Sequence, residues 1–377
     1  MIVNNEDSNL VRIGDYIEVY DVKNGNSKDF QFCGINKDKT FMPTVADTNE
    51  LDSSKYKIVE KDVFVFSGMQ TGRDVCIRLA LYDKDEPILV SPAYTTFIIK
   101  DKSEILPHYL FIQFNRFQMD RYGWFLSDGS IRSNLDWGIF CDIMIPLPDI
   151  DIQQELVDTY NGLKALAEQN EALIKPLIEA CQAYIVDCKE KHPEVELEEY
   201  IEACDERNSQ GKYTLRDVRG ISILKKLIPT KADMQDVLLT PYKLLKPKEF
   251  CYVTVTSRNG GKISLALNGL DETFMVSSSY EVFRCIDEKT LLPEYLFLIL
   301  SREEFDRFSR FNSWGSARET FDWSELCRVL IPLPPPKVQQ AIVDIYNCAE
   351  EAKKIANDAR EKMKNLCPAL VQRALNG

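Results

Sequence analysis

One segment in the second half of the chain combines residue types that contact nucleic-acid bases. Ser257, Arg258, Asn259 and Lys262 surround two glycines between two strand-like runs. Arginine can pair with the O6 and N7 atoms of guanine and asparagine with the N6 and N7 atoms of adenine. The glycines would let the backbone approach a phosphate. The same tetrad is also typical of an ordinary polar hairpin turn, and these residues alone leave both interpretations open.

A second candidate loop occurs twice. Residues 129–132 read Gly-Ser-Ile-Arg and residues 315–318 read Gly-Ser-Ala-Arg. Serine and arginine after glycine suit contacts to phosphates or base edges. The alternative, supported equally, is a structural loop whose arginine pairs with a nearby carboxylate such as Asp136 or Asp322.

Two further residues complete the candidate set. Arg73 follows a glycine in the first-half segment that corresponds to residues 253–260. Trp314 has Asp128 as its counterpart in the first half of the chain, so a tryptophan is not needed for the core of both halves. We therefore expect Trp314 at an exposed surface. The candidate nucleic-acid contacts are Arg73, Ser130, Arg132, Ser257, Arg258, Asn259, Lys262, Trp314, Ser316 and Arg318.

The chain offers little for catalysis or metal binding. Its 377 residues include 2 His, His108 and His192, and 11 Cys without a C-x-x-C pair. Histidine-dependent hydrolysis, a disulfide framework and a zinc finger are therefore disfavoured. Neither a G-x-G-x-x-G nor a P-loop lysine motif is present. We expect no catalytic, cofactor-binding or metal-binding residues.

The composition indicates a globular protein of the cytoplasm. Hydrophobic residues make up 45% and charged residues 28% of the chain, which is ordinary for globular proteins. No apolar run approaches the ~20 residues that a membrane span needs. The N-terminus lacks the basic and apolar regions of a signal peptide.

The elements that must position these loops occur twice along the chain, because the sequence is a tandem duplication. Residues about 186 positions apart match without a gap over roughly a hundred residues. Ile-Pro-Leu-Pro at residues 145–148 recurs at 331–334, and Asp136-Trp137 recurs as Asp322-Trp323. Each half has about 140 residues of mixed pattern followed by a long helical pattern.

The mixed segments predict strands and then a helix. The strand-like runs are residues 62–67, 75–81 and 95–99, with 249–254, 262–267 and 281–286 in the second half. They are rich in β-branched and aromatic residues and are broken by turn residues. Residues 107–122 and 293–311 follow with helical spacing, and each begins with proline.

After each Ile-Pro-Leu-Pro, apolar residues are spaced alternately by four and three, as in a coiled-coil seam. The second seam is rich in alanine, which lets helix axes approach closely. We expect the two helices to pair antiparallel, with kinks or breaks at Pro176 and Pro368. The alternative is that each helix covers only the mixed domain of its own half. The predicted fold class is α+β: two duplicated mixed α/β domains separated by two long antiparallel, coiled-coil-like helices, with pseudo-twofold symmetry.

This plan resembles the specificity (S) subunit of type I restriction–modification enzymes. Several motifs carry the resemblance, and they occur in a fixed order. Near the start of each mixed domain, or head, the chain reads L/I-x-x-Y-I-E-x-x-D, and each long helix is preceded by Ile-Pro-Leu-Pro and entered through Gln-Gln. The second head adds residues 257–262, 277–280 and 314–323. The domains it implies are target-recognition domain 1 at 1–148, spacer helix 1 at 149–192, target-recognition domain 2 at 193–334 and spacer helix 2 at 335–377.

The resemblance implies an adapter rather than an enzyme. In that family the two heads recognise a split sequence in double-stranded DNA, and the subunit binds two modification subunits. These partners bring S-adenosylmethionine and methylate adenine, and restriction subunits with ATP-driven motors can join. Consistently, the chain has no N-P-P-[YFW] tetrapeptide. Residues 67–74 and 253–260 differ, which implies that the heads read different half-sites.

The net charge of −13 argues against nucleic-acid binding when it is averaged over the whole chain. Much of the acidity lies in residues 194–206 and in the preceding helical segment, away from the candidate loops. A solvated face is the ordinary interpretation. The functional alternative is that this surface docks partner subunits whose basic surface supplies much of the phosphate attraction.

Two other function classes stay open from the residues. One is a protein-binding scaffold that never contacts DNA. The other is a self-contained nuclease using Asp149 with the distant Glu351 and Lys353, although no strand pattern supports such a site.

Overall fold

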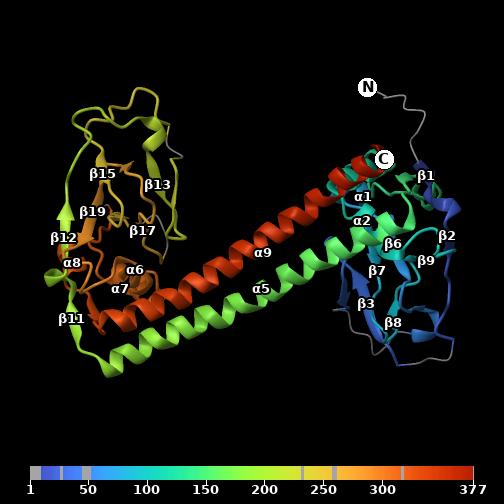
Figure 1. Ribbon diagram of the computed structural model, residues 1–377, viewed down its shortest axis with the longest axis horizontal. Helices are drawn as coiled ribbons and strands as arrows, with labels where there is room; N and C mark the ends of the chain where they lie inside the picture. Colours follow the sequence, from blue (N-terminus) through green and yellow to red (C-terminus); the bar gives the residue numbers. More distant parts are fainter. Residues whose placement is uncertain are drawn as a thin grey trace. The chain divides into compact units, whose positions relative to one another are not determined.

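The computed structural model describes residues 10–25, 29–44, 52–230, 233–256, 261–315 and 318–376, with side chains up to residue 366 except at residue 365. The chain forms two compact units. The first comprises Met1–Asn170 with Lys354–Gly377, and the second comprises Glu171–Lys353. Each unit contains one head and a part of both long helices (Figure 1).

The first head is built on small sheets. Its strands are β1 Leu10–Arg12, β2 Ile17–Val19, β3 Gln31–Ile35, β4 Phe41–Pro43, β5 Lys57–Val59, β6 Phe64–Ser67, β7 Arg78–Leu81, β8 Ile88–Val90, β9 Thr95–Ile99 and β10 Met144–Pro146. One sheet has the order β2-β9-β6-β7 and is antiparallel throughout. The other, β4-β3-β8-β5, contains one parallel pair, β3 with β8. β1 pairs with β10 and so joins the start of the head to its end.

Short helices cover these sheets. They are α1 Thr71–Asp74, α2 Pro107–Phe114, α3 Phe117–Leu126 and α4 Trp137–Cys141, with 3-10 turns at Ile13–Asp15 and Ser53–Lys55. The single helix predicted over residues 107–122 is wrong, because the extended backbone of Arg116 (φ −79°, ψ 136°) divides it. The break lets α2 bury six of its eight residues, whereas α3 buries only Met119 and Gly123.

The second head repeats this plan. Its strands are β11 Glu194–Glu196, β12 Ile201–Cys204, β13 Arg219–Ile221, β14 Leu227–Pro229, β15 Lys243–Leu245, β16 Phe250–Val253, β17 Leu265–Leu267, β18 Phe274–Val276, β19 Tyr280–Cys285 and β20 Leu330–Pro332. Its helices are α6 Pro293–Leu300, α7 Glu303–Phe311 and α8 Trp323–Cys327, with 3-10 turns at Leu197–Glu199 and Leu215–Asp217. The sheet β12-β19-β16-β17 and the pair β11-β20 correspond to those of the first head. The predicted helix at 293–311 is likewise divided, here at Ser301 and Arg302.

Both heads have the same aromatic centre. Phe64 stacks on Phe97 at 4.8 Å between ring centroids, and their counterparts Phe250 and Phe283 stack at 4.7 Å. The tryptophan that begins α4 or α8 lies against this pair. Pairing aromatic rings on facing strands is a specific way to fix sheet register, so the duplication preserves the core.

The two long helices are α5, Ile150–Lys191, and α9, Pro336–Asn376. α5 begins in the first unit and ends in the second, and α9 does the reverse, so they run antiparallel. In the second unit the Cys181 thiol of α5 lies 3.8 Å from the Ile342 carbonyl oxygen of α9. Neither proline breaks its helix: α5 continues through Pro176 and α9 through Pro368. A kink at either proline stays a prediction.

The apolar seam of each long helix is buried in part. Ala349, Ala352, Ala356 and Ala359 of α9 are buried, as the alanine-rich pattern predicts. In α5 the predicted seam residue Tyr184 is exposed, and its neighbour Ile185 is buried instead. The predicted fold class, two duplicated α+β heads with a pair of long antiparallel helices, is confirmed. Within the described part of the chain, no helix has the length and apolarity of a membrane span.

Candidate nucleic-acid interface

In the first head, two segments far apart in the sequence meet to form one surface. The Leu135 amide donates to the Gly68 carbonyl at 2.8 Å, and the Gly72 amide donates to the Ser133 carbonyl at 2.9 Å. These bonds place α1, which carries Arg73, beside the loop that joins α3 to α4. Three predicted residues, Arg73, Ser130 and Arg132, therefore belong to adjoining segments.

Local sequence explains the shape of the loop between α3 and α4. The Asp128 carboxylate accepts hydrogen bonds from the Ser130 hydroxyl at 2.6 Å and from the amides of Ser130 at 3.1 Å and Asn134 at 2.9 Å. These bonds hold the pKa of Asp128 below its usual range. Asp128 is thus committed to folding the loop, and the Ser130 hydroxyl is bound within it.

Arg73 lies in a cluster with excess positive charge. It is 60% exposed and donates to the Gln70 side-chain oxygen at 2.8 Å. Its neighbour Asp74 faces Arg73 and Lys37, both at 3.3 Å, and also Arg78. Burial opposes ionisation of Asp74, but hydrogen bonds from the three cations lower its pKa. One carboxylate shared by three cations leaves a surface that suits a phosphate.

Arg132 is exposed and makes no ion pair with any residue that the structure describes. The pairing with Asp136 that the sequence left open does not occur, because Asp136 caps α4 and accepts from the Gly138 amide at 2.7 Å. Arg318 of the second head is also exposed, and no described residue forms an ion pair with it, Asp322 included. Both guanidinium groups are available to a partner.

The second head brings its two segments together in the same way. The Thr256 amide donates to the Glu319 carbonyl at 3.0 Å, and the Phe321 amide donates to the Thr254 carbonyl at 2.8 Å. Trp314 exchanges backbone bonds of 3.0 and 2.9 Å with Thr320 across a turn. Its side chain is 62% exposed, as predicted.

Of the remaining candidates in the second head, the structure describes only Lys262. Lys262 is exposed and makes no ion pair with the described residues around it. Ser257, Arg258, Asn259 and Ser316 lie outside the described residues. Their roles stay predictions.

The sequence did not identify two features near these loops. Lys39 pairs with Asp120 and Lys225 with Asp306, each at 2.7 Å, beneath the helices of the two heads. The match of Asp120-Arg121 with Asp306-Arg307 was the available signal. The second feature is a row of exposed aromatic residues on α3, which includes Phe117 and Phe125.

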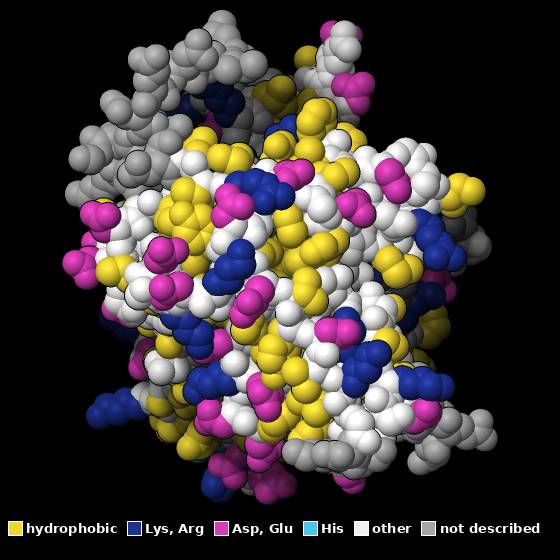
Figure 2. Space-filling model, turned by 90° about the vertical axis from the view of Figure 1, so that its right-hand side faces the viewer, with side chains coloured by type: hydrophobic (Ala, Val, Ile, Leu, Met, Phe, Trp, Pro, Cys, Tyr) yellow, Lys and Arg dark blue, Asp and Glu magenta, His cyan; other side chains and the backbone are white. Residues whose placement is uncertain are grey.

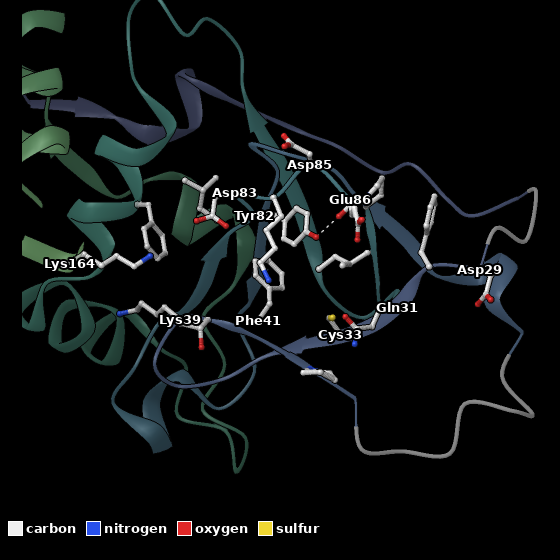
Figure 3. Close-up of a pocket in the computed structure, with 18 residues that line it drawn as sticks. Asp29, Gln31, Cys33, Lys39, Phe41, Tyr82, Asp83, Asp85, Glu86 and Lys164 are labelled. Carbon is white, nitrogen blue, oxygen red and sulfur yellow. Dashed lines mark hydrogen bonds between the residues drawn. The ribbon is translucent and has the colours of Figure 1, made fainter. Parts of the chain in front are cut away.

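A cavity of about 890 Å³ lies elsewhere in the first unit, beside the sheet β4-β3-β8-β5 (Figure 3). Lys39 and Lys164 lie toward one end of it, and Asp29 and Glu86 lie toward the other. The Tyr82 hydroxyl donates to the Glu86 carbonyl. No group of three or more metal-ligating side chains occurs among the described residues.

Comparisons with known proteins agree with this geometry. A family model described as the Type I restriction modification DNA specificity domain matches residues 5–179. Comparison with curated protein sequences gives no match. Among solved structures, the type I restriction-modification S subunit from M. genitalium has a TM-score of 0.58 at 11% identity, with 99% of this chain and 97% of that chain covered.

Two further structures are similar over most of their length but superpose less well. The HsdS subunit from Thermoanaerobacter tengcongensis has a TM-score of 0.40 at 16% identity, with 99% of this chain and 97% of that chain covered. A type I R-M system structure has a TM-score of 0.42 at 15% identity, with 98% of each chain covered.

The fold, in which one α+β head occurs twice along the chain together with a pair of long helices, and the family match to a DNA specificity domain define the class of protein: a DNA-specificity protein. The family match falls on the first copy of the repeat and the start of α5, and the second copy has the same order of elements. Residues 5–179 match the family of type I restriction–modification DNA specificity domains, and the whole chain has the fold of a type I S subunit. The role that the family model describes is DNA specificity.

Proposed function

We propose that the two heads read the two halves of a split DNA target, and that the loops at 67–74 with 127–135 and 253–262 with 313–321 make the contacts. The observation that carries this proposal is the pair of exposed arginines, Arg132 and Arg318, at equivalent positions of the two heads, neither of which forms an ion pair with a residue that the structure describes. Each arginine adjoins a second loop that differs in sequence between the heads. Different loops on a common scaffold suit two different half-sites.

The partners that fit this chain are two modification subunits, with restriction subunits in addition. S-adenosylmethionine and ATP would be bound by those partners and not by this chain. A complex of this kind would work in the cytoplasm. The chain itself supplies sequence recognition and the positions at which the partners assemble.

The acidic run at 194–206 supports a partner-docking surface. Glu202, Asp205 and Glu206 pair with Arg284, Arg207 and Lys246. The other carboxylates of the run are exposed and form no ion pair with described residues: Glu194, Glu196, Glu198 and Glu199. Four uncompensated charges in a short segment suit a basic protein surface. The isolated chain should then bind DNA weakly, and tight specific binding should require the partner.

Methylome mapping tests the proposed function. Cells that carry this gene with its modification partner are compared with cells that lack the gene. The expected motif has two short half-sites separated by a fixed spacer, and exchange of residues 1–145 should change only one half. A continuous motif, or a change in both halves, would contradict the proposal. A strong, salt-insensitive footprint by the isolated chain would contradict the docking role of the acidic surface.

A further inference from the structure

The outer face of α3 is an uncovered row of aromatic side chains. Phe117, Arg121, Trp124 and Phe125 are spaced by four, three and one residues, which places them on one side of a helix. Phe117 is 68%, Trp124 52% and Phe125 76% exposed. The Arg121 guanidinium lies 6.0 Å from the centroid of the Phe117 ring. Figure 2 looks at the first unit and shows apolar side chains at its surface.

Such a row is unusual on a protein surface unless something binds to it. Burying a phenyl side chain is favourable by about 1.5–3 kcal/mol, and contiguous exposed apolar patches mark interaction sites. In the same head, α2 buries Tyr109 and Phe114, and α4 buries Phe140. Among the helices α2, α3 and α4 of this head, the exposed aromatic residues lie on α3.

The same face differs in the second head. Glu303 and Arg310 of α7 replace Phe117 and Trp124, whereas Arg307 and Phe311 keep the residue types of Arg121 and Phe125. Phe311 is 78% exposed. Arg307 lies 3.9 Å from Glu303, and Arg310 pairs with Glu319. Two copies of one partner subunit would require the same surface on both heads. A surface that differs between the heads suits the ligand that also differs between them, which is the DNA half-site.

Charge and position favour the same ligand. Residues 105–135 contain only two carboxylates, Asp120 and Asp128. Asp120 is neutralised by Lys39, and Asp128 accepts hydrogen bonds within its own loop. The three arginines of this segment are Arg116, Arg121 and Arg132. In a chain of net charge −13, a segment with three arginines and only Asp128 as a carboxylate without a cation beside it is compatible with a polyanion.

The face also continues into the candidate interface. The Ser127 hydroxyl donates to the Gly123 carbonyl at 2.8 Å, which ties the end of α3 to the loop that carries Arg132. A Cβ atom added at Gly72 would lie 3.1 Å from the Ser127 Cβ atom, so α1 packs closely against the same junction. α3, Arg73 and Arg132 are therefore parts of one continuous surface.

We propose that α3 is a reading helix of the first head: it enters the major groove, and Trp124 and Phe125 contact the C5-methyl groups of thymines in the first half-site. The major groove admits an α-helix, and apolar side chains distinguish thymine by its methyl group. Arg121 contacts a neighbouring phosphate or base edge. This inference rests on the proposed function and adds a chemical preference to it. In the second head, α7 keeps the exposed Phe311 but has Arg310 in place of Trp124. The pair of aromatic residues that would contact the methyl groups is therefore present on α3 and not on α7.

Deoxyuridine, which lacks the C5-methyl group, is the probe. The complex of this chain with its modification subunits is titrated with DNA that contains the mapped target, with thymines of either half-site replaced by deoxyuridine. Loss of one buried methyl contact should weaken binding about fourfold, and only in the first half-site. Phe125→Ala and Trp124→Ala should weaken binding to the thymine target and abolish the difference between thymine and deoxyuridine. Leu224→Ala, an exposed apolar residue of the second head, is the control and should change neither.

Each outcome has a distinct meaning. Equal binding of thymine and deoxyuridine targets by the native complex, with Phe125→Ala unaffected, overturns the role of α3 and leaves the proposed function intact. Absence of sequence-specific binding by the native complex overturns the proposed function itself. A third outcome is that variants of α3 assemble poorly with the modification subunits, while the complex that does form still distinguishes thymine from deoxyuridine. This outcome would make the face a protein-docking site and would overturn the inference.

Discussion

Lys225 and Asp306 form an ion pair of 2.7 Å inside the second head, with side chains only 7% and 9% exposed. Lys39 and Asp120 form the same pair at the equivalent position of the first head. Both lysines have left-handed backbone geometry, with φ of 57° and 59°. Burial lowers the pKa of Lys225, although the hydrogen bond that Lys225 donates to the Asp306 carboxylate opposes this. The duplication has preserved a polar brace between a turn and the helix below the candidate interface.

Asp306→Asn should destabilise the second head by about 3–5 kcal/mol, because it leaves Lys225 buried without a counter-charge. The Asp306 carboxylate also accepts the Ile263 amide at 3.2 Å, so the strand segment before β17 loses part of its support. Urea unfolding of the whole chain measures the change. Asp271→Asn, an exposed carboxylate of the same head, is the matched control. Removing both charges with Lys225→Met and Asp306→Leu should cost less than the single change, and an equal or larger cost would contradict this account.

Gln153 and Gln339 should each contribute more to stability than their neighbours Gln154 and Gln340. The fully buried Gln153 side chain accepts the Leu106 amide at 2.9 Å and donates to the carbonyls of Glu104 and Pro148, both at 2.9 Å. Gln339 repeats all three bonds. Removal of a side chain that satisfies buried backbone groups costs about 1–3 kcal/mol per unsatisfied group.

Thermal unfolding of Gln153→Ala and Gln339→Ala measures this effect. Gln154 and Gln340 bond only to an aspartate of their own helix, at 2.8 Å, and their alanine variants are the controls. The expected loss is at least 1 kcal/mol for each buried glutamine and less than ~0.5 kcal/mol for each control. Equal losses would mean that the junction between each head and its long helix does not depend on these bonds.

The repeat made much of the fold predictable, because a shift of about 186 residues carries both core and helix pattern. The aromatic centre, the long helices and the alanine seam follow from it. The division of the helices at Arg116 and Arg302 does not, because apolar spacing continues through the break. The lysine–aspartate pairs were also missed, since each joins a loop residue to a helix far along the chain.

The sequence predicted which residues belong to the candidate site, but not whether their side chains are exposed or paired. The sequence identified Arg132 and Arg318 by their repeated motif, yet left their pairing with a carboxylate open. Only the fold shows that Asp136 is occupied as a helix cap. The exposure of the α3 aromatic residues was equally hidden, because aromatic residues at helical spacing ordinarily indicate a core-facing helix.

Arg132→Ala and Arg318→Ala should each relax one half-site and leave the other unchanged. An arginine that pairs with a base edge contributes about 1–3 kcal/mol of discrimination. Binding of the complex to targets altered in either half-site, measured by fluorescence anisotropy at several salt concentrations, separates the two. Arg328→Ala, an exposed arginine that contacts Glu325, is the control. Uniform weakening across all targets, with a lower salt slope, would instead indicate a phosphate contact. An effect of both variants on the same half-site would contradict the two-headed reading.

Gly315 and Gly129 occupy equivalent positions of the two heads but should respond differently to substitution. Gly315 has φ of 140°, and a Cβ atom there would lie 2.2 Å from the Arg318 carbonyl oxygen. A Cβ atom at Gly129 would meet nothing within 4 Å. Gly315→Ala should therefore strain the turn by about 1–3 kcal/mol and displace Arg318, which weakens binding through the second half-site.

Gly129→Ala is the matched variant and should change stability by less than ~0.5 kcal/mol, with a smaller effect on DNA binding than Gly315→Ala because it leaves the backbone of its loop unstrained. Urea unfolding and anisotropy on the two half-site series measure both properties in the same preparations. If Gly315→Ala has the same urea midpoint of unfolding as the native chain but no longer discriminates the second half-site, the turn contributes to recognition and not to stability. If the two alanine variants behave alike, the turn at Gly315 does not position Arg318, and the second head must present that arginine by other contacts.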